Sequence, residues 1–310
     1  MNKVTVVGSF MYDLVATAPR RPKTGETLIG DSFGMFLGGK GANQAIAASR
    51  AGAIVSMVGR LGNDLFGDQF LEKFSTEVIN TDFVIQDTEN GTGVGMPLID
   101  ASGDNSIVII PQANMALSVE NIDQAESSIA DSDVLVLQCE VPMEANQRAA
   151  EIANKNDTLV ILNPAPACEI PDALLSLVDI IIPNESETEI LTGMPTETDN
   201  QAIEAAHLLL SKGIETVILT LGSRGSFLLT KKMEKVIPAY SVEVVDTTAA
   251  GDAFCGALAA SLAHGINIEK SVKIANAAGA LAVTKLGAEP SLPSREEINI
   301  FRMGMQYFDS

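Results

Sequence analysis

The sequence predicts an α/β protein, built as a doubly wound, mainly parallel sheet with helices on both faces and a small antiparallel β lid. Three observations predict this fold class. Short aliphatic, β-branched runs alternate with helical patterns along most of the chain. Two stretches interrupt that alternation with hairpin-like patterns, and the chain after residue 252 is mostly helical. Alternation of strands and helices is typical of right-handed βαβ units in a parallel sheet.

The predicted strands of the large sheet are apolar on both faces, as strands between two layers of helices are. In "DVLVLQ" the four central residues are all aliphatic, so no polar residue alternates with them. The predicted strands lie at residues 3–8, 55–59, 133–138, 158–163, 179–183 and 216–222.

Helical patterns lie between these strands and dominate the C-terminal part of the chain. The last two helices are expected to end at Gly265 and Gly287, because glycine is favourable just beyond a helix C-terminus. The predicted helices span residues 41–51, 65–76, 143–154, 171–177, 185–192, 199–212, 252–265 and 268–287.

Two stretches break the alternation and are predicted to form the lid. Residues 24–37 and 92–110 carry antiparallel patterns, and the second has a "DASGDN" turn between two apolar runs, which favours a hairpin. We expect a single domain over residues 1–310, with the lid formed by about residues 12–37 and 92–111. The apolar lid faces need cover, which a ligand and a second copy of the chain would provide in a homodimer.

Composition and charge argue against several classes of partner. The chain has 310 residues, of which 46% are hydrophobic, and a formal net charge of −20. A strongly acidic chain repels nucleic-acid phosphates and anionic membrane surfaces, so we expect neither as a partner. No run of 18 apolar residues occurs, and the N-terminal residues read as a strand rather than a secretory signal.

Cysteine and histidine usage gives no sign of a disulfide framework or a zinc site. Cys139, Cys168 and Cys255 are odd in number, widely spaced and without a C-x-x-C pair. We therefore expect buried thiols in a reducing compartment, the cytoplasm. His207 and His264 lie in helical patterns with no partner nearby in the sequence, so we expect no catalytic or metal role for them.

The segment "VVDTTAAGDAFCG" at 244–256 carries the main chemical signal. Asp252 stands at the start of an Ala-rich helix, where a carboxylate can simply cap the helix by accepting amide protons. Ala249, Ala250 and Gly251 also leave backbone N–H groups open to an anion, such as a transferring phosphoryl group. A carboxylate beside such a cradle can take a proton from a hydroxyl, so a general base is the alternative to a cap.

Further polar motifs lie in loops and at strand ends. "GGKGANQ" sets Lys40 and Asn43 beside a glycine loop, although it lacks the Walker A spacing. "LQCE" places Glu140 at the carboxyl end of a strand, and "PNESE" (183–187) and "LGSRG" (221–225) follow two other strands. Each alone is typical of a turn or a cap. Open α/β sheets bind ligands at this edge, however, so together they indicate a site.

These motifs together resemble the ribokinase family, the PfkB-type carbohydrate kinases, along essentially the whole chain. The resemblance implies a ribokinase-like fold and an ATP-dependent sugar kinase that also uses Mg²⁺ and a monovalent cation, usually K⁺. A Rossmann dehydrogenase is disfavoured, because G-x-G-x-x-G is missing after the first strand. The matching segments are "GS…D" (8–13), "GETL" (25–28), "GGKGANQA" (38–45), "NPAPA" (163–167), "PNESE" (183–187), "TLGSRG" (220–225), "DTTAAGDAF" (246–254) and "GAEPS" (287–291).

The family resemblance also implies roles for individual positions. Asp252 matches the catalytic base, and residues 249–251 match its anion hole. Asn184 and Glu187 match the pair that organises magnesium and phosphates through water. The positions that match sugar contacts are Asp13, Gly39, Lys40, Asn43 and Glu140.

Two further sets of positions are implied by the same resemblance. The positions that match nucleotide contacts are Thr220, Gly222, Gly225 and Asn276. The positions that match ligands of the monovalent cation, mostly through backbone carbonyls, are Asp246, Thr248, Ala282, Lys285, Gly287 and Ser291.

One position departs from the family pattern. Ribokinases carry Asn two residues before the Asp of "GSxNxD", whereas this chain has Met11 in "GSFMYD". A thioether cannot bond sugar hydroxyls as an amide does, and the pattern resembles the deoxyribokinase branch. Two interpretations stay open. Met11 faces a sugar carbon that lacks its hydroxyl, or Met11 only packs and ribose is still accepted.

The implied reaction is in-line phosphoryl transfer from ATP to a primary hydroxyl, O5 in a pentose, with Asp252 as the base. The expected substrates are 2-deoxyribose and ribose, and another furanose or a nucleoside is the alternative within the family. A sugar- or nucleotide-binding regulator without catalysis is the alternative from another class. The intact Asp252 and Gly251 argue against a regulator, because a protein that only binds needs no base.

Overall fold

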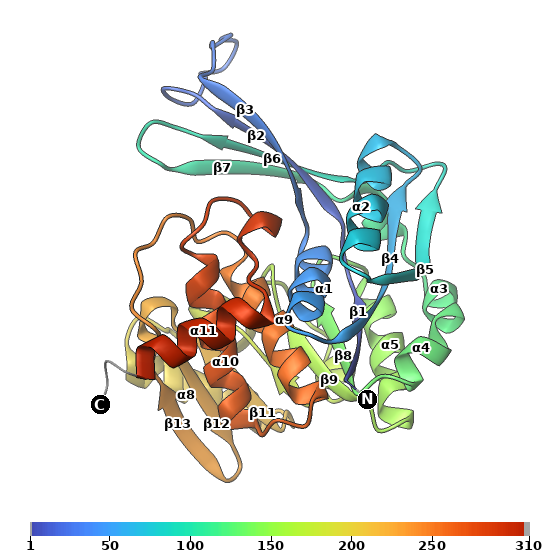
Figure 1. The fold of residues 1–310 in the computed structure, drawn as a ribbon, viewed down its shortest axis with the longest axis vertical. Coiled ribbons are helices and arrows are strands. Elements are labelled where there is room, and N and C mark those ends of the chain that lie inside the picture. The colour runs from blue at the N-terminus through green and yellow to red at the C-terminus, as the bar shows by residue number, and fades with distance from the viewer. Residues whose placement is uncertain (1, 307–310) are drawn as a thin grey trace.

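The structure is a computed structural model that describes residues 2–306, and it contains two sheets (Figure 1). The large sheet has nine strands, and the small sheet has four. The predicted fold class is confirmed, because the large sheet is mostly parallel and helices cover both of its faces. The small sheet projects from one side of this body as the predicted lid. Within residues 2–306 no helix is long and apolar enough to cross a membrane.

The large sheet has the order β13-β12-β11-β10-β9-β8-β1-β4-β5. Every predicted strand is present, although β10 has only two residues, and β5 and the antiparallel hairpin β12–β13 were not predicted. The strands are β1 (Lys3–Val7), β4 (Ile54–Gly62), β5 (Asn80–Asp87), β8 (Val134–Gln138), β9 (Leu159–Asn163), β10 (Ile180–Ile181), β11 (Thr216–Thr220), β12 (Ser226–Thr230) and β13 (Met233–Ile237).

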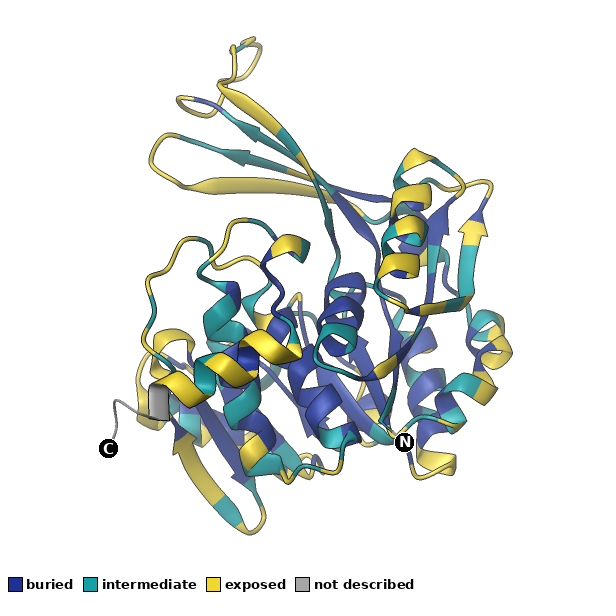
Figure 2. Ribbon diagram, viewed as in Figure 1, coloured by how far each residue is buried: buried dark blue, intermediate teal, exposed yellow. Residues whose placement is uncertain are grey.

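Alternate residues of the central strands enter two separate cores, one on each face of the sheet. In β8, Val134 and Val136 belong to one core, while Leu135 and Leu137 belong to the other. This double burial explains why these strands show no polar alternation, and Figure 2 shows them as buried along their length.

Helices of the two layers supply the rest of each core. Those packed on the first core are α1 (Lys40–Arg50), α2 (Leu65–Thr76), α9 (Ala250–Ala263), α10 (Ile268–Ala282) and α11 (Arg295–Gln306). Those packed on the second are α3 (Val119–Gln124), α4 (Glu126–Ala130), α5 (Met143–Lys155), α6 (Asp172–Leu175), α7 (Glu185–Thr192) and α8 (Asp199–Ser211). The short helices α3 and α4 and the C-terminal α11 were not predicted from the sequence.

Helices α1 and α9 approach each other closely at a glycine. A Cβ placed on Gly256 would lie 2.5 Å from the Ala47 Cβ and 2.7 Å from the Ala48 backbone nitrogen. Such distances leave no room for any side chain at position 256, so the two helices pack almost backbone to backbone. This contact fixes the position of the N-terminal turn of α9 relative to α1.

The lid is a four-stranded sheet in the order β3-β2-β6-β7. The predicted hairpin at 92–110 is confirmed, and Gly103 takes a left-handed conformation (φ 87°) in its turn. Two strand pairs are antiparallel, but the central pair β2–β6 is parallel, because both strands leave the same edge of the large sheet, after β1 and after β5. The strands are β2 (Met11–Thr17), β3 (Ser32–Gly38), β6 (Gly93–Ile99) and β7 (Asn105–Ile110).

The lid prediction was wrong for residues 24–31, which form a turn and an irregular segment before β3. The Glu26 backbone N–H donates to the Lys23 carbonyl at 3.0 Å, which closes the turn. Pro19 and Pro22 lie just before it and have no N–H to offer a strand partner, so pairing resumes only at β3.

The prediction for α10 was also wrong at its end, because the helix stops at Ala282 rather than near Gly287. The Val283 carbonyl, which a longer helix would pair with residue 287, instead accepts from the backbone N–H groups of Val245 (2.7 Å) and Asp246 (3.2 Å). Tertiary hydrogen bonds therefore replace the helical ones and free the chain beyond residue 283 to form a loop.

Candidate active site

The candidate site lies at the carboxyl edge of the large sheet, next to the N-terminus of α9. Glu140 follows β8, Asn163 ends β9, Asn184 follows β10 and Thr220 ends β11. Parallel strands end at one edge, so the fold gathers residues that are far apart in the sequence. The residues that line the hollow at this edge are Lys40, Asn163, Ala165, Ile182, Asn184, Glu187, Thr220, Thr247, Ala249, Ala250, Gly251, Asp252 and Cys255.

Asp252 does not cap its helix. Helix α9 begins at Ala250, its N-cap is Ala249 in a left-handed conformation (φ 58°, ψ 10°), and no side chain among the described residues caps this end. Asp252 is the third residue of the helix and is only 7% exposed. The first-turn backbone of α9 thus lines the hollow without a side-chain cap, as an anion-binding helix end requires.

Both carboxylate oxygens of Asp252 accept hydrogen bonds from α1. Asn43 Nδ2 donates to Oδ2 at 2.9 Å, and Gln44 Nε2 donates to Oδ1 at 2.9 Å. Burial raises the pKa of Asp252, and the charge of Lys40 and the two amide bonds only partly oppose this effect. The carboxylate is therefore more basic than one in water and is held in a single orientation.

Lys40 supplies positive charge to the hollow. Burial would lower its pKa, but the carboxylates of Asp252, Glu140 and Glu187 outweigh burial and raise it. Its backbone N–H donates to Glu140 Oε2 at 2.9 Å, and the Ser9 hydroxyl donates to the same oxygen. A protein with a large negative net charge thus keeps a protonated lysine where an anion would bind.

Asp13 lies on β2 between two glycines of neighbouring strands. A Cβ on Gly38 would lie 2.6 Å from one carboxylate oxygen, and a Cβ on Gly95 would lie 2.1 Å from the other. Burial and the charge of Glu140 raise the pKa of Asp13 to about 6. Within residues 2–306 no donor bonds this carboxylate, so its oxygens can accept hydrogen bonds from a ligand.

Met11, the first residue of β2, is buried and fixed by its neighbours. Asn114 Nδ2 lies 3.4 Å from Met11 Sδ, and the same amide exchanges two hydrogen bonds of 2.8 Å with the Phe10 backbone. A Cβ on Gly93 would lie 2.6 Å from the sulfur, and a Cβ on Gly39 would lie 2.6 Å from the Met11 nitrogen. The thioether is therefore packed against Asn114 and Gly93, while the Met11 backbone lies beside Gly39, the residue before α1.

Asn184 and Glu187 form a capping box at the start of α7. Asn184 Oδ1 accepts from the Glu187 N–H at 2.8 Å, and Glu187 Oε2 accepts from the Asn184 N–H at 2.8 Å. Both residues also line the hollow. Burial raises the pKa of Glu187, although the Asn184 amide and the charge of Lys40 oppose the rise. The "NESE" motif thus serves the helix and the site together.

Of the four predicted nucleotide positions, Thr220 alone lines the hollow. Gly222 (φ 56°) and Gly225 (φ 95°) shape the 3-10 turn after β11, and a Cβ on Gly225 would lie 2.1 Å from the Ile237 carbonyl oxygen. Asn276 Nδ2 donates to that same oxygen at 3.2 Å. Gly222 and Gly225 thus build the turn beside the hollow, while Asn276, on α10, holds the end of β13; none of the three lines the hollow.

Three of the six predicted cation positions meet at one carboxylate. Asp246 Oδ1 accepts from the Thr248 N–H at 2.9 Å and from its hydroxyl at 2.7 Å, while Oδ2 accepts from the Gly287 N–H at 2.9 Å. Burial would raise the pKa of Asp246, but these three hydrogen bonds lower it. The segment before α9 is thereby tied to the segment after α10.

The other three predicted positions lie in or next to that second segment, residues 284–292, which we call the cation loop. The Ala282 carbonyl accepts from the Lys285 N–H at 3.2 Å, and Lys285 Nζ lies 2.9 Å from Glu297 Oε1. Ser291 is fully buried, and its hydroxyl donates to the Ala288 carbonyl at 2.7 Å. The available donors are carboxylate, hydroxyl and carbonyl oxygens, a set that suits a hard cation.

Neither histidine lines the hollow. His264 Nδ1 bonds the Ala260 carbonyl at 2.7 Å, and His207 Nε2 lies 3.6 Å from a Glu234 oxygen. Cys255 does line the hollow, but burial and the nearby carboxylates raise its pKa well above the usual thiol value. It is therefore a neutral thiol rather than a nucleophile.

Comparison with known proteins identifies the family. Residues 1–295 match the profile of the pfkB family carbohydrate kinases. The chain belongs to this family. A ribokinase from Haemophilus influenzae is 42% identical over 294 residues, which cover 95% of this chain and 96% of the relative. A deoxyribokinase from Salmonella typhi is 39% identical over 297 residues, covering 96% of this chain and 97% of the relative.

A solved structure gives the same result for the fold of this pfkB kinase. The Arabidopsis thaliana ribokinase complexed with ribose and ATP superposes with a TM-score of 0.91 at 33% identity, covering 97% of this chain and 98% of that one. The predicted family, the ribokinase-like fold and the enzyme class, a carbohydrate kinase, are therefore confirmed.

Sequence reasoning missed three side-chain amides that bond one another next to the base of this pfkB kinase. They belong to Gln44, Gln138 and Asn163, and we call them the amide relay. Gln44 Nε2 donates to Asn163 Oδ1 at 3.0 Å as well as to Asp252, and Gln138 Nε2 donates to Gln44 Oε1 at 2.8 Å. Gln138 and Asn163 are fully or almost fully buried. Both end otherwise aliphatic strands, and an amide in that place is the signal that could have indicated them.

Proposed function

We propose that this carbohydrate kinase transfers the γ-phosphoryl group of ATP to the primary 5-hydroxyl of a pentose, either 2-deoxyribose or ribose. The observation that carries the proposal is the buried Asp252 carboxylate, fixed by Asn43 and Gln44 beside an uncapped helix N-terminus. The relatives named ribokinase and deoxyribokinase, and the relative solved with ribose and ATP, support the same sugar class and donor.

Acceptor groups near the base would hold the sugar. Asn43 Oδ1 is buried and has no partner among the described residues. The Asp13 carboxylate, whose pKa burial raises, is a second acceptor. Glu140 lies close enough to Asp13 to raise its pKa. Sugar hydroxyls are donors that satisfy such groups, and an unsatisfied buried acceptor strongly favours a ligand that supplies a hydrogen bond.

Asp252 would act as the general base of the transfer. Its carboxylate takes the proton of the sugar hydroxyl while that oxygen forms a bond to the γ-phosphorus, and the bond from phosphorus to the leaving oxygen of ADP breaks. The backbone amides of residues 250–252 and the Lys40 ammonium stabilise the charge on the phosphoryl oxygens. A raised pKa helps because it makes Asp252 a stronger proton acceptor than an exposed aspartate.

The site also fits magnesium bound through water. Within residues 2–306 no cluster of three or more His, Cys, Asp or Glu side chains could hold a metal on its own. Mg²⁺ commonly keeps several waters and is bound by one or two carboxylates and substrate phosphates. Asn184 and Glu187, which line the hollow with oxygen donors, are the residues that would hold it. Bound there, Mg²⁺ would neutralise phosphate charge.

We further propose that K⁺ binds between the Asp246 segment and the cation loop. Asp246 already joins Thr248 to Gly287, and these residues lie directly before and after the α9–α10 pair. A cation there would hold residues 246–249, the segment that leads into α9. It would therefore fix the position of the N-terminus of α9 without contacting the substrate.

We propose a homodimer through the lid, with residues 1–310 forming one domain. The lid has no helical layer, and every residue of β7 is exposed (Figure 2). An apolar face of this kind on an open sheet is a site for association. The exposed large apolar residues of the lid are Ile29, Phe33, Met35, Met96, Ile107, Val108, Ile109 and Ile110.

We also propose a cytoplasmic location. All three cysteines are free, and Cys255 is buried among apolar neighbours. Free thiols without disulfides are the usual state in a reducing compartment.

The direct test is an ADP-release assay of the purified protein with ATP, Mg²⁺ and K⁺ across a panel of acceptors. The panel is 2-deoxyribose, ribose, a hexose that adopts a furanose ring, and a nucleoside. The Asp252→Asn variant is the control for contaminating kinases. We expect turnover with the two pentoses and a product whose phosphorus couples to the C5 protons in NMR. Preferential turnover of the nucleoside, or none with any acceptor, would contradict the proposal.

A further inference from the structure

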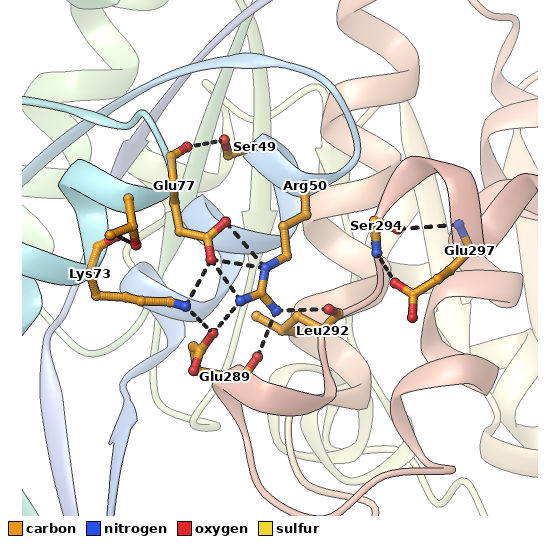
Figure 3. Close-up of polar contacts among 9 residues, drawn as sticks. Ser49, Arg50, Lys73, Glu77, Glu289, Leu292, Ser294 and Glu297 are labelled. Atoms are coloured by element: carbon orange, nitrogen blue, oxygen red, sulfur yellow. Dashed lines mark hydrogen bonds and ion pairs between the residues drawn. The ribbon is translucent and has the colours of Figure 1, made fainter.

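Four charged side chains form a compact cluster at the C-terminal end of α1 (Figure 3). Arg50 Nη2 lies 2.7 Å from Glu77 Oε1 and also pairs with Glu289, while Lys73 Nζ lies 3.0 Å from Glu77 and 2.8 Å from Glu289. The cluster is neutral, with two cations and two anions, and its side chains are only 14–26% exposed. Ion pairs this sheltered are weakly screened and need all their partners.

Arg50 makes further contacts that an ordinary ion pair does not need. Its Nη1 donates to the Glu289 carbonyl at 2.9 Å and to the Leu292 carbonyl at 2.8 Å. These carbonyls lie at both ends of the short 3-10 helix Glu289–Ser291. The Arg50 guanidinium thus bonds a side chain and two backbone carbonyls of the cation loop at once. A lysine ammonium, with its single nitrogen, cannot do so.

The cluster connects the cation loop to the helix that holds the base. Arg50 is the last residue of α1, and Asn43 and Gln44 of the same helix bond the Asp252 carboxylate. Residues 41–48 of α1 are all buried, so the helix is packed along most of its length. A packed helix transmits a displacement of its end rather than absorbing it.

Two more contacts bring other parts of the molecule to the same loop. The Gly287 N–H donates to Asp246 Oδ2 at 2.9 Å. A Cβ on Gly287 would lie 3.6 Å from the ring of Phe36, which belongs to lid strand β3. The cation loop is therefore held from three sides, by Asp246, by the lid and by Arg50.

We infer that Arg50 is a positioning residue for this kinase: through Glu289 and the Leu292 carbonyl it holds the cation loop in register with α1, and thereby sets the affinity of the proposed potassium site. The inference rests on the proposed potassium site and goes beyond it, because Arg50 itself contributes no ligand. Loosening the loop lowers the fraction of protein that is ready to bind the cation, and the apparent affinity falls by the same factor.

The sharpest variant is Arg50→Lys, which keeps the charge but loses the forked contacts. Glu289→Gln is the second variant, because it leaves the Arg50–Glu77 pair intact. Arg148→Lys is the matched control, since Arg148 also joins two helices through an ion pair, with Nε 2.6 Å from Asp123 Oδ1. All proteins are full-length and are titrated with KCl at constant ionic strength, with LiCl as the balancing salt.

Two readouts are compared along each titration. One is kcat at saturating ATP and pentose, and the other is the Tm of the unliganded protein, which rises when a cation binds the folded state alone. For Arg50→Lys and Glu289→Gln we expect the K⁺ midpoint to rise about tenfold or more in both readouts. At saturating K⁺ we expect kcat within about threefold of the unmodified protein, and we expect no midpoint change for Arg148→Lys.

The outcomes separate the inference from the proposals beneath it. A K⁺ midpoint in Arg50→Lys and Glu289→Gln equal to that of the unmodified protein would overturn the role of Arg50 while leaving the potassium site intact. An equal shift in Arg148→Lys would overturn it too, because the effect would then reflect general stability. An unmodified kinase that responds to K⁺ in neither readout would remove the potassium site and this inference together, and leave the pentose kinase proposal standing.

Discussion

Strands β8 and β7 have similar apolar sequences and opposite surroundings. "VLVLQ" in β8 is buried at every residue, whereas "NSIVII" in β7 is exposed at every residue (Figure 2). The difference lies in the connections, because β8 belongs to βαβ units whose helices cover both faces, while the lid strands are joined by loops and turns. An apolar run therefore shows that a strand needs cover, but not whether its own chain provides it.

The two regions also divide the work that we propose. The body, which is the large sheet with its helices, carries Asp252 on α9, the amide relay and the loops around the hollow. The lid carries Met11 and Asp13, which lie at the end nearest the body, and an outer apolar face. Substitutions in the body should thus change the rate of transfer, and substitutions in the lid should change sugar choice and assembly.

The largest expected effect is at the base in the body. Asp252→Asn keeps the shape and one hydrogen bond acceptor but cannot take a proton, so kcat should fall by about 10²–10⁴-fold. Binding of ATP and of the pentose, measured by calorimetry, should change little. A variant with nearly unchanged kcat would show that Asp252 only supports the helix.

The second largest effect is expected on the outer face of the lid. Ile109 shares the face of Asp13, because both pair with Gly95, whereas Val108 points to the opposite, outer face. Val108→Glu should raise the dimer dissociation constant by about 10²-fold or more, because a carboxylate would be buried against apolar residues. Val236→Glu is the matched control, since Val236 is similarly exposed (55% against 61%) on the edge strand of the large sheet. Sedimentation over a micromolar range measures both. Equal behaviour of the two variants, or a monomeric unmodified protein, would contradict a lid dimer.

A smaller effect is expected where the lid meets the body. Met11→Asn should shift the ratio of kcat/KM values from 2-deoxyribose toward ribose by about five- to 150-fold. A buried hydroxyl without a partner costs roughly 1–3 kcal/mol, and an asparagine would supply one. Asn114→Leu serves as a companion, because it removes the contact to the Met11 sulfur without adding a donor for the sugar. A ratio unchanged by Met11→Asn would mean that Met11 only packs.

The smallest effect is a pH-dependent gain in stability at Asp13. Its pKa rises from the ordinary 3.8 to about 6 in the folded protein. The folded state thus binds its proton more tightly, and rising pH between these values costs stability. Asp13→Asn should therefore raise the free energy of unfolding by about 1–2 kcal/mol at pH 8 and by less at pH 5, and should weaken sugar binding.

Urea unfolding of the unliganded protein at both pH values measures this gain. Asp104→Asn, at an exposed position in the lid turn, is the control for the removal of one negative charge from the lid. A gain at Asp13 that is independent of pH would mean that the carboxylate is not strained by its burial.

Features that rest on local pattern could be predicted from the sequence, and features that rest on distant partners could not. The strand at 133–138 and the 92–110 hairpin follow from periodicity and turn residues, and both are present. The end of α10 could not be predicted in this way, because the backbone N–H groups of Val245 and Asp246 bond the Val283 carbonyl that a longer helix would use. Residues 24–31 carry a strand-like pattern, but they form no strand, and Pro19 and Pro22 just before them are the local sign that pairing stops.

The candidate site shows the same division. Asp252 is identifiable because its neighbours in the chain, three small residues, already suggest an anion cradle. Gln44 meets Gln138 and Asn163 across 94 and 119 positions, and Arg50 meets Glu289 across 239. Glutamine in an apolar strand or arginine at a helix end has many local explanations, so only the fold reveals which partner it has.

The glycine contact between α1 and α9 makes the position of the proposed base sensitive to any side chain added at residue 256. Gly256 is one helical turn after Asp252, and a Cβ added there would collide with Ala47 and Ala48, which lie one turn after Asn43 and Gln44. The Asp252 carboxylate and its two amide partners thus lie on two helices whose backbones are in contact, with no side chain between them at this point. A single methyl group added at position 256 would push α9 away from α1, and so move Asp252 away from Asn43 and Gln44 by a fraction of an ångström. A misplacement of about 1 Å is enough to cost a reaction some 10²-fold. Alignment in this kinase would then depend as much on a residue that reaches no substrate as on those that do.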